Sequence, residues 1–76
     1  MTAHRPVVTA QQLARIAHRL GFELDRQKGS HAIYYRGSDK ARVVIPMHAG
    51  KALKLKTLAG ILDDMGITAD ELRSLL

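Results

Sequence analysis

The chain has 76 residues, enough for one small domain with a modest core, so any functional site should be shallow and built from surface groups. It has no cysteine, which excludes disulfides and thiolate metal sites and suits a reducing cytosol. The N-terminus lacks a signal-peptide pattern, and no stretch reaches the ~20 apolar residues of a membrane span. We therefore expect a soluble cytoplasmic protein with no membrane partner.

The positive charge is concentrated in the middle of the chain. The net charge is +5 and the pI is about 10.1. The basic segment, residues 26–56, has eight basic residues and one acid, whereas the remainder has four basic and six acidic residues. This uneven distribution of charge is typical of proteins that bind nucleic acid, although a solvated basic surface would have the same composition.

The first predicted element is a helix over residues 10–20, preceded by a loose leader at residues 1–8. Thr9 and Gln12 have the spacing of a capping box, in which each side chain satisfies an exposed backbone N–H. Gly21 suits the left-handed position that follows a helix. The helix has one apolar face, formed by Leu13, Ile16, Ala17 and Leu20.

Three strands should follow, at residues 22–27, 31–35 and 41–46. The first alternates apolar and polar residues, as a half-buried strand does. Residues 28–30 and 36–40 have turn chemistry, and Pro46 should end the third strand. Tyr34 and Tyr35 point to opposite faces of the sheet, so one should pack in the core while the other could stack on a base or also pack.

The last third of the chain should contain a basic loop and two helices. The loop covers residues 47–56, and loops of this length are often functional. A second helix should include Leu58 to Met65, and Thr68 and Glu71 form a capping box for a short third helix. The prediction is a single α+β domain over residues 1–76, ordered α-β-β-β-α, with helices on one face of a three-stranded antiparallel sheet.

His31 is the candidate catalytic residue. It follows Gly29 and Ser30 at the start of a strand, so it should be exposed, and it lies within the basic segment. Imidazole exchanges protons near neutral pH. RNA supplies its own nucleophile, the 2′-hydroxyl, so a histidine with nearby cations can suffice for cleavage. The alternative is a structural or incidental histidine.

Other residues of the basic segment are candidates for nucleic-acid binding. His48 could complete an acid–base pair, contact a phosphate or base, or only cap the loop. Ser30 could orient His31 or simply form the turn. Lysines of this segment could bind phosphates as a group: Lys28, Lys51, Lys54 and Lys56. His31 and His48 lack acid or thiol companions at ligand spacing, so we expect no metal and no cofactor.

Three motifs in sequence order resemble the HicA toxin family. They are G-F-x-L at residues 21–24, R-Q-K-G-S-H at residues 26–31, and a looser V-P-x-H-x-x-K-x-L from Val44. The similarity extends from Leu13 to Ile67. Two positions depart from the family pattern: Leu55-Lys56-Thr57 lacks the glycine of K-x-G-T, and Ala32 stands where many members have a second histidine.

The resemblance implies a fold similar to a double-stranded-RNA-binding domain and an activity as a messenger-RNA interferase. Such toxins cleave RNA without a metal, using the histidine that corresponds to His31. It also implies a HicB antitoxin that binds and silences the toxin. The toxin could then be a monomer or part of a heteromeric complex with the antitoxin. The alternatives are a non-catalytic RNA- or DNA-binding module and an interaction protein for an acidic partner.

Overall fold

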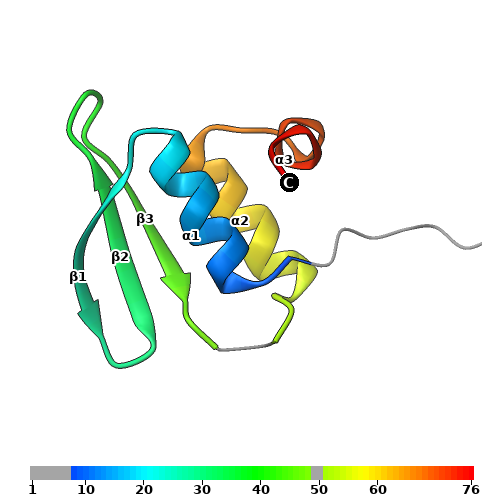
Figure 1. Ribbon diagram of the computed structural model, residues 1–76, viewed down its shortest axis with the longest axis horizontal. Coiled ribbons are helices and arrows are strands. Elements are labelled where there is room, and N and C mark those ends of the chain that lie inside the picture. The colour runs from blue at the N-terminus through cyan, green and yellow to red at the C-terminus, as the bar shows by residue number, and fades with distance from the viewer. Residues whose placement is uncertain (1–7, 49–50) are drawn as a thin grey trace, which may run out of the picture.

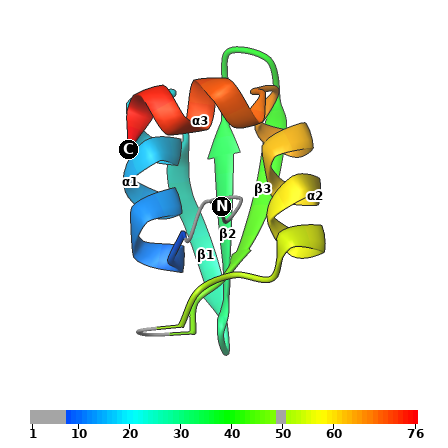
Figure 2. The same ribbon diagram turned by 90° about the vertical axis from the view of Figure 1, so that its right-hand side faces the viewer.

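The computed structural model of the chain describes residues 8–48 and 51–76. Its elements, in order, are α1 (Ala10–Arg19), β1 (Glu23–Lys28), β2 (His31–Arg36), β3 (Ala41–Pro46), α2 (Leu55–Met65) and α3 (Ala69–Leu75). The strands form an antiparallel sheet in the order β1-β2-β3. Helices α1 and α2 lie on one face of this sheet, and α3 crosses near one end (Figures 1 and 2). The predicted α-β-β-β-α fold of the α+β class is confirmed.

The two predicted capping boxes are present and begin α1 and α3. The Thr9 backbone N–H donates to the Gln12 side chain at 2.9 Å, and the Gln12 N–H donates to the Thr9 hydroxyl. Thr68 and Glu71 repeat the arrangement.

No helix within the described residues could span a lipid bilayer, given its length and composition.

The core lies between the helices and the covered face of the sheet. Alternate residues of β2 and β3, including Ala32, Val43 and Ile45, point toward the helices and are buried. They meet the apolar faces of the helices, whose buried members are Ala10, Leu13, Ile16 and Ala17 of α1, Leu58, Ile61, Leu62 and Met65 of α2, and Leu72 of α3.

The first strand differs from the prediction of a half-buried strand. All six residues of β1 are exposed, and the exposed fraction of Leu24 is 53%. The alternation is present in the sequence, but β1 is an edge strand that the helices do not cover. Phe22, predicted as the first strand residue, instead precedes β1 and is fully buried.

Two further boundaries differ from those predicted. Helix α2 begins at Leu55, so Leu55 and Lys56 belong to its first turn rather than to the loop. Leu55 is exposed, which removes it from the apolar pattern that marks the rest of the helix. Val8, placed in the loose leader, is fully buried in the core, whereas residues 1–7 of that leader lie outside the described residues.

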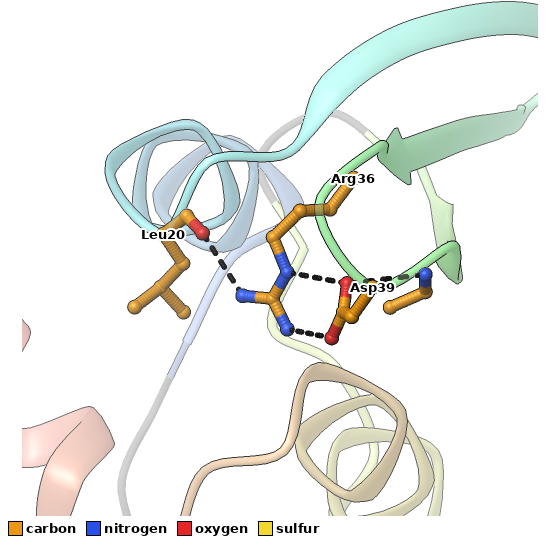
Figure 3. A network of polar contacts seen from close by, with 4 residues as sticks. Leu20, Arg36 and Asp39 are labelled. Carbon is orange, nitrogen blue, oxygen red and sulfur yellow. Dashed lines mark hydrogen bonds and ion pairs between the residues drawn. The ribbon is translucent and has the colours of Figure 1, made fainter.

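Arg36 contacts Leu20, Asp39 and Phe22 at one end of the sheet, and Figure 3 shows the contacts with Leu20 and Asp39. Its guanidinium donates to the Leu20 carbonyl at the end of α1 and forms a two-bond ion pair with Asp39 in the β2–β3 turn. It also lies 4.4 Å from the centre of the Phe22 ring. Gly21 has a φ of +93°, and a Cβ there would lie 3.3 Å from the Arg36 side chain. The G-F pair thus has a structural role at this junction.

Replacing Asp39 by asparagine should reduce stability near neutral pH and matter less in acid. Hydrogen bonding to Arg36 lowers the pKa of Asp39 below its ordinary value. A carboxyl with a lowered pKa in the folded state stabilises the protein above its unfolded pKa, about 3.9, and this contribution disappears as the pH falls through the folded pKa. Urea midpoints of the wild type and Asp39→Asn should therefore begin to converge below about pH 4 and meet only below the lowered folded pKa of Asp39. A difference that persists unchanged in acid would contradict this assignment.

Candidate functional site

A two-residue turn places His31 at the first position of the central strand. Gly29 has a φ of +57°, a left-handed conformation that glycine adopts without strain, and Lys28 pairs directly with His31 across the turn. On its other side His31 pairs with Pro46, the last residue of β3. The imidazole therefore lies beside Lys28 and at the point where the chain leaves the sheet.

The chain after β3 remains next to this turn. The Met47 N–H donates to the Ser30 carbonyl, which extends the β2–β3 ladder by one residue. The His48 N–H donates to the Pro46 carbonyl at 3.1 Å, and the His48 carbonyl accepts from the Lys51 N–H at 3.2 Å. These bonds hold His48 near His31. Ala49 and Gly50, part of the predicted basic loop, lie outside the described residues.

Contacts with the start of the chain fix the other side of the loop. Ala52 forms an antiparallel bridge with Thr9, and the Leu53 N–H donates to the Val8 carbonyl at 2.8 Å. Lys54 then serves as the N-cap of α2 with an extended backbone. The burial of Val8 anchors this segment to the core.

These segments border an open hollow of about 550 Å³. Four of the predicted site residues line it: His31, His48, Lys51 and Lys54. All four are exposed, and no hydrogen bond joins either imidazole to another residue within 8–48 and 51–76. The remaining lining residues are Pro46, Ala52, Leu53 and Thr57.

The other predicted binding residues lie outside the hollow. Lys28 flanks His31 in the sheet, and the Ser30 carbonyl accepts from the Met47 N–H. Lys56 is exposed in the first turn of α2 but does not line the hollow. The structure thus brings together four of the seven candidates and leaves Lys28 as a neighbour.

The start of α2 borders the hollow through Thr57, a residue that the sequence prediction missed. Lys54 makes no side-chain cap, and the first turn has no acidic residue. The free N–H groups at the start of a helix favour an anion, and Lys54, at the N-cap, and Lys56, in the first turn, lie at the start of α2. Little in the sequence predicted this helix start, because lysine is not a preferred N-cap residue.

The donor set of the hollow suits a phosphate rather than a metal. Among the residues described, no group of three histidine, aspartate, glutamate or cysteine side chains could hold a metal ion. The lining supplies two imidazoles that can exchange protons and two ammonium groups that can balance anionic charge. Such a set can perform acid–base chemistry at a phosphodiester.

Two comparisons with known proteins bear on this arrangement. No curated protein matches the chain. The family model described as the HicA toxin of bacterial toxin–antitoxin systems matches residues 10–67, which include every helix and strand except α3. Since this match covers most of the chain, the protein belongs to the HicA toxin family and is the toxin of a toxin–antitoxin system.

Proposed function

We propose that this toxin is a metal-independent endoribonuclease that cleaves messenger RNA, with His31 as its acid–base catalyst. The observation that carries the proposal is the convergence of His31, His48, Lys51 and Lys54 on one open hollow at the start of α2. An open hollow can admit a polynucleotide chain, whereas a small enclosed pocket could not.

In the proposed reaction, the RNA 2′-hydroxyl attacks the adjacent phosphate. His31 removes the hydroxyl proton, and the lysines stabilise the charge on the pentacoordinate phosphorane. The bond to the 5′-oxygen of the next nucleotide then breaks, and that oxygen takes up a proton. His48 borders the same hollow, so it can supply this proton or contact the phosphate. The products are a 2′,3′-cyclic phosphate and a 5′-hydroxyl.

The proposal is tested with RNA and DNA of one sequence in the presence of a chelator. We expect cleavage of the RNA alone, because DNA lacks the 2′-hydroxyl. Binding of both polymers without cleavage of either would instead favour a non-catalytic nucleic-acid-binding module.

Replacing Lys51 and Lys54 together by alanine should weaken RNA binding for every sequence. Each phosphate contact with single-stranded RNA adds about 0.7 to the slope of log affinity against log salt. Loss of two contacts should therefore flatten this slope by about 1.4. The measurement is a salt titration of RNA affinity in His31→Ala, where the RNA remains intact. An unchanged slope would show that these lysines do not contact RNA.

We also propose that a HicB-type antitoxin inhibits the toxin by covering the hollow. The cationic residues at this site attract an acidic partner and speed its association. An inhibitor that covers them would block both the RNA and the catalytic histidine. The competing arrangement places the antitoxin on the acidic surface of α2 around Asp63 and Asp64, which are exposed.

Occlusion predicts that antitoxin and RNA compete for His31→Ala toxin. When the toxin is mixed with increasing amounts of antitoxin, its measured affinity for RNA should fall as the fraction of toxin bound to antitoxin rises. A ternary complex with undiminished RNA affinity would overturn occlusion and favour the remote surface.

A further inference from the structure

One face of the sheet is left uncovered by the helices (Figure 1). Residues paired directly across antiparallel strands lie on the same face, so the register divides this open face into three rows. From the hollow outward the rows are Lys28–His31–Pro46, Arg26–Ile33–Val44 and Glu23–Tyr35–Arg42.

The open face combines cations with apolar and aromatic groups. Its cations are Arg26, Lys28 and Arg42, all exposed, and Glu23 lies in the row farthest from the hollow. Asp25, at an irregularity in β1, has a carboxylate oxygen 3.9 Å from the Arg26 guanidinium. The exposed fractions of Tyr35 and Val44 are 36% and 41%, so both present apolar surface to solvent. Exposed apolar groups surrounded by charges mark interaction surfaces.

We infer that this open sheet face is the path along which single-stranded RNA reaches His31. Bases lie on Ile33, Val44 and Tyr35, while Lys28, Arg26 and Arg42 contact phosphates. Tyr35 stacks on one base, as aromatic residues on sheets do in other RNA-binding proteins. It is four residues from His31 along β2, roughly 13 Å, so it would contact a nucleotide near the scissile phosphate rather than the reacting one.

Continuity with the hollow favours RNA over a protein partner. His31 belongs to both the open face and the hollow. A polynucleotide cleaved at an internal position must leave His31 in two directions. The hollow provides cations on one side, and the open face provides them on the other. An acidic protein that bound the open face would not require cations on both sides of His31.

This inference rests on the proposed function and deepens it, so its test measures binding separately from cleavage. The probe is a fluorescently labelled single-stranded RNA of mixed sequence, bound to the His31→Ala protein. In that background, Arg26→Ala with Arg42→Ala should flatten the salt slope by about 1.4. The charge-matched control is Arg15→Ala with Arg73→Ala, on helices α1 and α3, and it should leave the slope unchanged.

Tyr35 provides a second, uncharged readout. Tyr35→Ala should weaken RNA binding roughly 5- to 150-fold, the range expected for one stacked base, whereas Tyr35→Phe should retain affinity. Circular dichroism and thermal melts establish that each variant is folded.

Three outcomes separate this inference from the proposed function. Sheet variants that bind RNA normally, while Lys51→Ala with Lys54→Ala weakens binding, overturn the sheet path and leave the ribonuclease proposal standing. Sheet variants that lose only antitoxin binding assign the face to the antitoxin and also overturn it. Failure of the wild-type protein to cleave RNA would overturn the ribonuclease proposal, whatever the sheet variants do.

Discussion

Replacing His31 by alanine should abolish growth arrest and lower the rate of RNA cleavage by about 10²- to 10⁴-fold, the usual contribution of one acid–base group. The fold should persist, because His31 is exposed and makes no side-chain contact that the core requires. Changes at such surface positions usually cost within about 0.5 kcal/mol of the free energy of unfolding.

The matched control is His18→Ala. His18 is also exposed, but it lies on α1 and does not line the hollow. Cleavage assays and thermal melts of both variants decide the role of His31. Near wild-type cleavage by His31→Ala would end the catalytic assignment, and a large fall in its melting temperature would instead indicate a structural histidine.

Replacing Phe22 by alanine should destabilise the protein by about 3–5 kcal/mol. Its ring is fully buried between the end of α1 and the sheet, and it also contacts the Arg36 guanidinium. For a domain of this size, such a loss should lower the melting temperature by more than about 12 °C.

Leu24→Ala is the control for this effect, because it removes a large apolar side chain two residues away. Leu24 is mostly exposed, so its loss should cost within about 0.5 kcal/mol. Chemical denaturation of both variants tests the difference. Similar small costs for the two would show that Phe22 is not a core residue of the folded protein in solution.

Local signals in the sequence were sufficient to predict most of the fold. The capping boxes at Thr9 and Thr68 each place a hydroxyl and a longer polar side chain at the required spacing, and both helices begin there. The turn residues between the strands, together with Pro46, delimited β2 and β3. The helices' apolar faces identified the core.

The errors arose where tertiary contacts decide the structure. The alternation in β1 predicted a half-buried strand, but burial depends on what covers a strand, and the helices pack mainly against β3 at the opposite edge of the sheet. Val8 has no periodic neighbours, so only its contact with the segment before α2 reveals that it is buried. The start of α2 was missed because Leu55 points to solvent and Lys54 is an unusual cap.

Only part of the candidate site could be predicted from the sequence, because its geometry also depends on tertiary contacts. His31, His48, Lys51 and Lys54 could be named from their residue types and from their places in turns and loops. Their convergence depends on the register between His31 and Pro46 and on the bridge between Thr9 and Ala52. Such pairings join residues far apart in the chain, and no local pattern encodes them.

The most direct test of the proposed mechanism is the chemistry of the product ends. A synthetic RNA is incubated with the wild-type toxin in the presence of a chelator, and the fragments are analysed by mass spectrometry. Attack by the 2′-hydroxyl predicts a 2′,3′-cyclic phosphate on one fragment and a 5′-hydroxyl on the other. Fragments that end in a 3′-hydroxyl and a 5′-phosphate would show that water attacks the phosphate and would contradict the mechanism.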